Sequence, residues 1–243
     1  MTDGMTIRHV HEHIARLAMN LDTEISQSDV GAVYPRPVLC TFAINPELQR
    51  RVETGSWELH SATNSTYIKM VDCLAYGVSF MKDEQKCNPK SFMQLVIQLA
   101  FYRLYGNKPA ATYEPVSTAN FCQGRIEVCR VVTEEVIAFC SAMTQEPRNK
   151  AACCSLFHDA VQAHQKVIDA ALKGQGIDRH FLALRRMVRD NEPVPALFED
   201  ALFRRSSCYK ICTTTLATGC EEIGFYPIVE GGWGISFLLR ESR

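Results

Sequence analysis

The chain of 243 residues is long enough for one large domain or two small ones with a real hydrophobic core. Apolar residues make up 47%, charged residues 22%, and the net charge is −1. This balance excludes a strong electrostatic field for nucleic acid or an anionic membrane. No apolar run approaches the length of a membrane span, and the first twenty residues lack the apolar core of a secretion signal.

The eleven cysteines are odd in number, irregularly spaced and free of any C-x-x-C motif. Several of them, such as Cys129, Cys140 and Cys153, lie in or beside apolar helical patterns, where a free thiol behaves as a small hydrophobic group. We therefore predict no disulfide framework and a reducing, intracellular compartment. The cysteine pattern does not distinguish between cytosol, mitochondrion and peroxisome as the compartment.

The N-terminal segment shows helical spacing of apolar residues from Ile7 to Met19. On such a helix His9 and His13 share a face. Two histidines without a third ligand nearby are typical of a solvated face, so we predict no metal site here. Residues 21–36 are polar and are predicted to be a linker.

Three segments follow between residues 38 and 76. Val38–Phe42 is predicted to be a short strand. Asn45 is predicted to cap a helix that begins at Pro46 and runs to about Ala62. Tyr67–Tyr76 is apolar and rich in residues that favour strands.

A charged segment, Lys82–Lys90, contains three lysines and is predicted to be a loop. Such a run is usually a solvated surface, although lysines can also hold a phosphate-rich ligand as point charges. Asn88 and Pro89 are predicted to cap the helix that follows, Ser91–Tyr105, which Gly106 should end.

The stretch Thr112–Arg130 has no helical period, and lies between two predicted helices. It contains two pairs of opposite charge, Arg125 with Glu127 and Glu114 with Arg130. A polar segment between packed elements must satisfy its own hydrogen bonds, and sites are often built in such places. Composition alone leaves an ordinary surface strand and loop equally open.

The remaining chain alternates helical and strand patterns, which favours an α/β fold. Thr133 is predicted to cap one helix, and Asp178 could cap another. Further helices are predicted at Arg148–Leu172 and near 196–204, and strands at Cys208–Thr215, Glu222–Val229 and Trp233–Leu239.

Six segments, in the correct order, resemble motifs of the carnitine/choline O-acyltransferase family. They are residues 88–103 (NPKSFMQLVIQLAFYR), 112–117 (TYEPVS), 121–130 (FCQGRIEVCR), 176–184 (GIDRHFLAL), 211–214 (ICTT) and 229–234 (VEGGWG). The resemblance implies an α/β fold of the chloramphenicol acetyltransferase, CoA-dependent acyltransferase type, with a mixed β-sheet covered by helices. Residues 1–243 look like the C-terminal half of the family's domain, with a shortened C-terminal end.

The family reaction moves an acyl group between coenzyme A and the hydroxyl of carnitine or choline. A histidine base deprotonates the hydroxyl, and a hydroxyl donor stabilises the oxyanion. None of the seven histidines lies in the family's H-x-x-x-D/E-G motif. Asp3-Gly4 resembles the end of that motif, which would place the base two positions before Met1. His164 and His180 match structural positions of the family.

The resemblance implies five site residues. Tyr113 and Arg179 would bind the carnitine carboxylate, and Phe225 would lie beside the trimethylammonium group. Thr214 would be the catalytic hydroxyl that serves the oxyanion. Lys82 would contact the phosphates of coenzyme A, which is expected as a co-substrate, with no bound cofactor.

Several positions differ from the family pattern. Ile126 replaces a threonine that donates to the carboxylate, as in choline enzymes, whereas Arg179 is of the carnitine type. Ile223 favours short or medium acyl chains. The other changes are Pro115 for serine, Val78 for a phosphate-site lysine, Gln165 for a coenzyme-side arginine and Thr215 for glutamine. Losing two cations should weaken the binding of a polyphosphate.

We therefore expect an acyl-CoA:carnitine acyltransferase of fatty acid metabolism that needs the missing N-terminal half as its partner, so that this fragment alone does not turn over. Nucleic acid is not an expected partner. A choline-type acyltransferase and a non-catalytic binding module derived from the family are the alternatives. A structurally compromised half would instead expose a large apolar patch and aggregate.

Overall fold

The computed structural model describes residues 9–10, 13–14, 16, 38–215 and 224–241. The chain divides into two compact units, Met1–Val71 and Asp72–Arg243. His9 and His13 have helical backbone and exposed side chains. The rest of the predicted Ile7–Met19 helix and the predicted linker lie largely outside the described residues.

The first unit contains helix α2, Pro46–Asn64. The side chain of Asn45 accepts a hydrogen bond from the backbone N–H of Leu48 at 2.8 Å, which confirms the predicted cap. The predicted strand at Val38–Phe42 is wrong, because among the described residues this segment pairs with no other strand, and it is exposed. Tyr67–Tyr76 likewise forms no strand, despite its composition.

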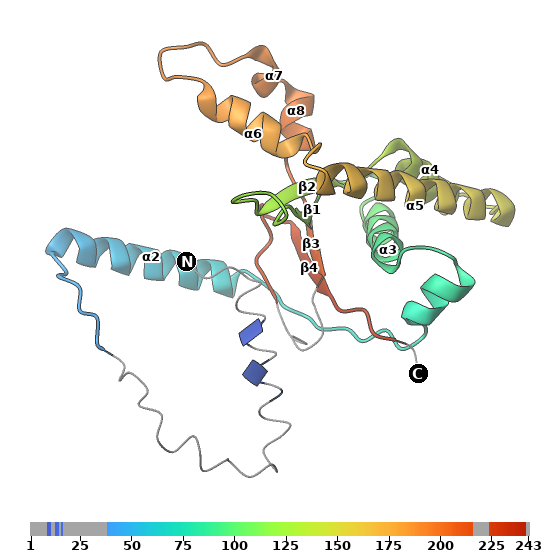
Figure 1. The fold of residues 1–243 in the computed structure, drawn as a ribbon, viewed down its shortest axis with the longest axis horizontal. Helices are drawn as coiled ribbons and strands as arrows, with labels where there is room; N and C mark the ends of the chain where they lie inside the picture. The colour runs from blue at the N-terminus through green and yellow to red at the C-terminus, as the bar shows by residue number, and fades with distance from the viewer. Residues whose placement is uncertain (1–8, 11–12, 15, 17–37, 216–223, 242–243) are drawn as a thin grey trace, which may run out of the picture. The chain divides into compact units, whose positions relative to one another are not determined.

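The second unit is built around a four-stranded sheet in the order β2-β1-β3-β4 (Figure 1). The strands are β1 (Thr112–Ser117), β2 (Ile126–Arg130), β3 (Ile211–Thr215) and β4 (Trp233–Phe237). β1 pairs antiparallel with β2, whereas β1–β3 and β3–β4 are parallel. This mixed sheet with helices confirms the predicted α/β class. The predicted strand at Glu222–Val229 is absent over residues 224–229; its first two residues lie outside the described ranges.

The register between β1 and β2 separates one of the two pairs of opposite charge noted in the sequence. Tyr113 lies opposite Arg130, and Glu114 lies opposite Cys129. Successive side chains of a strand point to opposite faces, so Glu114 and Arg130 face different sides of the sheet. These two opposite charges therefore do not meet.

The helices of this unit are η2 (Phe80–Glu84, a π-helix), α3 (Pro89–Leu104), α4 (Glu134–Ala142), α5 (Lys150–Leu172), α6 (Asp178–Met187), α7 (Ala196–Glu199) and α8 (Ala201–Ser206). Asn88 and Thr133 cap α3 and α4 as predicted, and Asn149 caps α5. Two predictions need correction. Lys82–Lys90 is not all loop, because it begins inside η2, and the helix predicted near 196–204 is split at Asp200.

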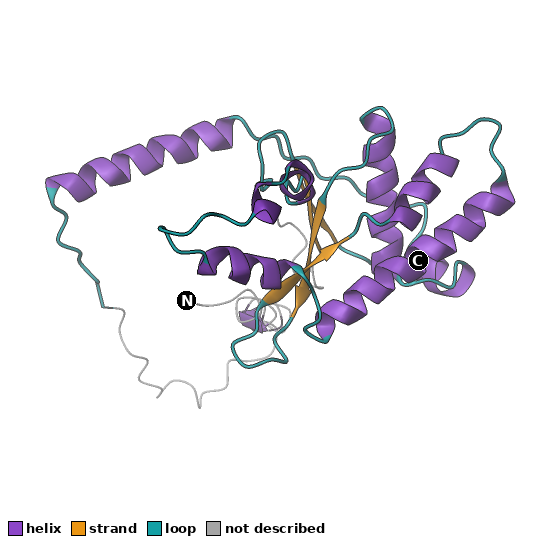
Figure 2. Cartoon of the chain, turned by 90° about the horizontal axis from the view of Figure 1, so that it is seen from above, coloured by secondary structure: helices purple, strands orange, loops and turns teal. Residues whose placement is uncertain are grey.

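The main core lies where α3, α4 and α5 pack together and includes Leu95, Val136, Phe139 and Ala160. A second cluster, with Ile97 and Ile211 at its centre, joins α3 to the sheet. Figures 1 and 2 show α3, α4 and α5 grouped beside the strands, with α6, α7 and α8 away from that group. None of the helices described is both long and apolar enough to cross a membrane.

Candidate functional site

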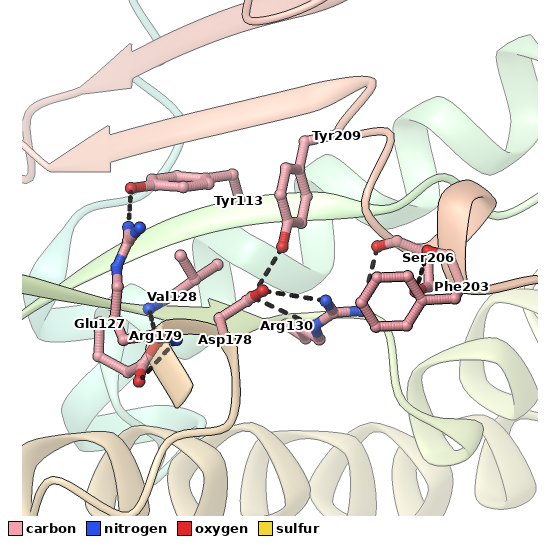
Figure 3. Close-up of polar contacts among 9 residues, drawn as sticks. All are labelled: Tyr113, Glu127, Val128, Arg130, Asp178, Arg179, Phe203, Ser206 and Tyr209. Carbon is pink, nitrogen blue, oxygen red and sulfur yellow. Dashed lines mark hydrogen bonds and ion pairs between the residues drawn. The ribbon is translucent and has the colours of Figure 1, made fainter. Parts of the chain in front are cut away.

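Tyr113 and Arg179, which were predicted to act together, are in direct contact. Tyr113 is the second residue of β1 and Arg179 the second residue of α6. The Arg179 Nη2 donates a hydrogen bond to the Tyr113 hydroxyl at 2.9 Å, and its Nε donates to the carbonyl of Ile126 at 3.1 Å. Figure 3 shows the guanidinium reaching up from α6 to the phenol. The two contacts fix the arginine head group against the β1–β2 pair.

This pair has hydrogen-bond donors left over. A guanidinium has five N–H groups, and Arg179 uses two of them in the contacts above, so three are free within the described structure. Burial raises the pKa of Tyr113, and Arg179 only partly offsets that rise. The phenol is therefore protonated at neutral pH; its oxygen accepts from Arg179 while its own hydrogen can be donated. A cation beside such a hydroxyl suits a carboxylate ligand.

Glu127 holds the backbone of Arg179 in place. Its buried carboxylate accepts from the N–H of Val128 at 2.7 Å and from the N–H of Arg179 at 3.2 Å. A carboxylate at a helix N-terminus also interacts favourably with the helix dipole. No ion pair joins Glu127 to Arg125, the oppositely charged residue two positions before it. It instead ties the start of α6 to β2.

A second polar group ties the same helix start to the sheet. Arg130 donates from Nε and Nη2 to the two carboxylate oxygens of Asp178, at 3.2 and 3.0 Å, and the Tyr209 hydroxyl donates to Asp178 at 2.7 Å (Figure 3). Burial and the hydrogen bond to Asp178 raise the pKa of Tyr209. Sequence reasoning missed this group because its members are far apart in the chain. Asp178 is the first residue of α6 and does not cap it as predicted, because the N-cap position is Ile177, whose side chain makes no capping hydrogen bond.

Thr214 and Phe225 lie near β3 and β4. Thr214 is half-buried on β3, opposite Ser236 of β4. The ring of Phe225 lies against Gly234, where an added Cβ would be only 3.1 Å from the ring. Lys82 is exposed on η2. Within the described part of the chain, no hydrogen bond joins any of these three to the Tyr113–Arg179 pair, so their roles stay predictions.

The positions where cations were expected to be lost have other contacts. Val78 is buried in the core. Gln165 accepts from the Asn88 amide at 3.3 Å and donates to Asp169 at 3.0 Å. Neither offers a positive charge for a phosphate. Ile223 lies outside the described residues.

A buried polar cluster joins α3, β1, β2 and α5. His164 contacts Glu114 Oε2 through Nε2 at 2.6 Å and Ser91 Oγ through Nδ1 at 2.9 Å. Ligand atoms of His164, Glu114 and Cys129 lie within 4.8 Å of one another, close enough to hold a metal ion. Burial, helped by nearby Glu114, raises the pKa of the Cys129 thiol. The cluster acts as an internal hydrogen-bond network, which fits the structural role predicted for His164.

Comparisons with known proteins identify the family of this chain. The sequence profile of the Choline/Carnitine o-acyltransferase family matches residues 1–243, and the chain belongs to this family. It is 31% identical over 243 residues to a choline O-acetyltransferase of Mus musculus, an alignment that covers 97% of this chain and 37% of that protein. It is 30% identical over 211 residues to a carnitine O-acetyltransferase of Mus musculus, covering 86% of this chain and 33% of the relative.

The chain thus spans about a third of the length of these relatives. The mixed sheet with its helices is consistent with the fold of the family. Both carnitine and choline enzymes occur among the relatives at about the same identity, so the family membership does not select the acyl acceptor.

Proposed function

We propose that this protein takes part in acyl transfer between coenzyme A and carnitine, and that the Tyr113–Arg179 pair binds the carnitine carboxylate. The observation that carries the proposal is the contact between the two side chains, with free N–H groups on Arg179 and a protonated phenol on Tyr113. A carboxylate that leaves water needs a cation and donors around it. Choline has no carboxylate and would leave these donors unused.

The other predicted site residues have complementary roles in this proposal. The Phe225 ring would attract the trimethylammonium group through its π face. The Thr214 hydroxyl would donate to the oxyanion of the tetrahedral intermediate. Lys82 would meet a phosphate of the co-substrate coenzyme A as a point charge. Ile223 supports a short or medium chain for the acyl group that is transferred.

Acyl transfer also needs a base for the substrate hydroxyl. Among the residues in the described ranges, no hydrogen bond joins a histidine side chain to Thr214 or to the Tyr113–Arg179 pair. We assign the base to a segment outside these ranges, such as the family's N-terminal half. The 243-residue chain by itself is then expected to bind carnitine without turning it over.

Isothermal titration calorimetry with L-carnitine and with choline tests the proposal. Carnitine should bind more tightly than choline, and Arg179→Asn should weaken carnitine binding by about tenfold or more while choline is unaffected. Arg185→Asn is the matched control, because Arg185 is exposed on the same helix. Equal binding of both ligands by the wild type, or an Arg179→Asn variant that binds carnitine normally, would reject the carboxylate site.

Choline is the second candidate acceptor. Ile126 supports it, because its side chain offers no hydrogen bond to a carboxylate, and choline O-acetyltransferases are among the relatives at 31% identity. Tighter binding of choline in the same titrations would favour this reading.

A non-catalytic module is the third candidate. Mass spectrometry for acylcarnitine or acylcholine after incubation with acyl-CoA separates it from an enzyme. The assay is repeated with an N-terminal half of the family supplied. If the protein still binds its ligand but no acylcarnitine or acylcholine forms, the non-catalytic module is favoured.

A further inference from the structure

Asp178 lies immediately before Arg179, and its carboxylate contacts two other side chains, those of Arg130 and Tyr209. We propose that Asp178 is a positioning residue that holds the Arg179–Tyr113 pair in the geometry needed to recognise a carboxylate. This inference rests on the proposed function for the identity of the ligand. The positioning itself is a property of the protein and can be measured without any ligand.

Asp178 belongs to a closed ring of four contacts, shown in Figure 3. It is joined to Arg179 by the peptide bond, and Arg179 donates to the Tyr113 hydroxyl at 2.9 Å. The Tyr113 ring packs edge-on against the Tyr209 ring, with centroids 5.3 Å apart and an interplanar angle of 83°. The Tyr209 hydroxyl returns to Asp178 at 2.7 Å. The Asp178 carboxylate therefore constrains both members of the pair. It acts on Arg179 through the peptide bond and on Tyr113 through the Tyr209 ring.

Arg130 fastens this ring to the sheet. Its guanidinium binds both oxygens of Asp178, donates to the carbonyl of Ser206 at 3.1 Å and lies 5.9 Å from the centre of the Tyr209 ring. Arg130 is also the register partner of Tyr113 across the β1–β2 pair. The start of α6 is thus held at a defined place beside Tyr113.

The charges within this group favour the proposal. The carboxylate of Asp178 is neutralised by Arg130, with a hydrogen bond from Tyr209, and no ion pair joins it to Arg179. Although Asp178 is adjacent in the sequence, it therefore forms no ion pair with the guanidinium of Arg179. The positive charge of Arg179 is left for a ligand.

Fixing a side chain before the ligand arrives lowers the entropy cost of binding, which is large for a flexible arginine. Without the Asp178 carboxylate, Arg130 loses its counter-charge, and Arg130 and Tyr209 must share the one acceptor oxygen that an asparagine keeps. Arg179 would keep its charge, but its position relative to Tyr113 would no longer be enforced. Carnitine recognition should then fall, whereas binding of choline, which lacks the carboxylate, should not.

The test compares Asp178→Asn with Asp190→Asn in the 243-residue protein. Both variants make the same chemical change, but Asp190 is exposed beyond the end of α6. NMR with labelled arginine and tyrosine follows the Arg179 Nε–H and the Tyr113 ring, and chemical unfolding checks that the fold is kept. In Asp178→Asn we expect both signals to shift and the Nε–H to exchange faster with solvent. Carnitine affinity should fall by about tenfold, with choline affinity unchanged.

Tyr209→Phe is the second variant, in case Asp178→Asn does not fold. It removes the hydroxyl that donates to Asp178 but keeps the ring that packs on Tyr113. We expect the same signal shifts, faster exchange and loss of carnitine affinity as in Asp178→Asn, but smaller. Unchanged Arg179 and Tyr113 signals, or an unchanged ratio of carnitine to choline affinity in a folded variant, would overturn the positioning role. If the wild type binds no carnitine, the proposed function fails, while the NMR signals still decide whether Asp178 positions the pair.

Discussion

Gly176 lies directly against the side chain of Glu127. A Cβ added to Gly176 would be 2.2 Å from Glu127 Cγ and 2.5 Å from its Oε2, far inside van der Waals contact. Glu127 cannot easily move away, because its buried carboxylate accepts hydrogen bonds from Val128 and Arg179. The glycine is therefore needed to bring the start of α6 onto β2, which is where Arg179 is presented.

Gly176→Ala should destabilise the protein by roughly 1–3 kcal/mol, because overpacking forces Glu127 out of its hydrogen bonds. Urea unfolding measures the change. Gly55→Ala is the control, since nothing lies within 4 Å of its added Cβ in the middle of α2, and it should stabilise by roughly 0.5–1 kcal/mol. A Gly176→Ala protein as stable as the wild type would show that the contact with Glu127 is not as close as described.

Ile126→Thr should increase carnitine affinity. The Ile126 carbonyl accepts from Arg179, so its side chain lies at the edge of the site and is partly exposed. A hydroxyl there could donate to the ligand carboxylate, and a hydrogen bond to a charged group is worth roughly 1.5–3 kcal/mol. Titration calorimetry with carnitine measures the gain, and choline serves as the comparison ligand because it should gain nothing. A parallel gain for choline would mean that the new hydroxyl acts by another route.

Glu114 and His164 should be energetically coupled. Replacing either residue with alanine leaves the other as a buried polar group without this partner, which costs roughly 1–3 kcal/mol beyond the lost packing. The second replacement should then cost less than the first. A double-mutant cycle of unfolding free energies measures this, and additive effects of the two replacements would argue against the buried hydrogen bond.

Stability should fall at alkaline pH because of buried thiols. Burial raises the pKa of Cys140 from 9.0 to about 11. Between these values the unfolded thiol loses its proton while the folded one keeps it, so the contribution to stability is complete below about pH 9 and is lost progressively up to about pH 11.

Unfolding free energies across this pH range provide the measurement. Cys140→Ala should reduce the slope, although its cavity lowers stability at every pH. Cys154→Ala, which removes an exposed thiol, should leave the slope as it is. An identical slope in the Cys140→Ala protein would exclude this thiol as a cause.

Local signals in the sequence were sufficient to predict where helices begin. Asn45, Asn88 and Thr133 each accept a hydrogen bond from a backbone N–H two or three positions further on, so the residues that decide the cap are neighbours in the chain. Gly174 ends α5 with a φ of +70°, a conformation that a glycine adopts without strain. Such features need no knowledge of the rest of the fold.

Strands were predicted less well, for a physical reason. A strand is stable only where a partner satisfies its backbone groups. Val38–Phe42 has the composition of a strand but finds no partner in the described part of the chain. The register also decided that Glu114 meets His164, 50 positions away, and not Arg130. Pairing cannot be inferred from a segment considered alone.

The candidate site shows the same division. The motifs alone identified Tyr113 and Arg179 as a pair through their resemblance to the family. Their hydrogen bond, 66 positions apart in the sequence, and the ring through Tyr209 and Asp178 depend on where β1, α6 and the start of β3 meet. The residue types were thus readable from the sequence, whereas only the tertiary structure placed the Asp178 carboxylate beside Arg130, because packing of distant segments determines which charges become neighbours.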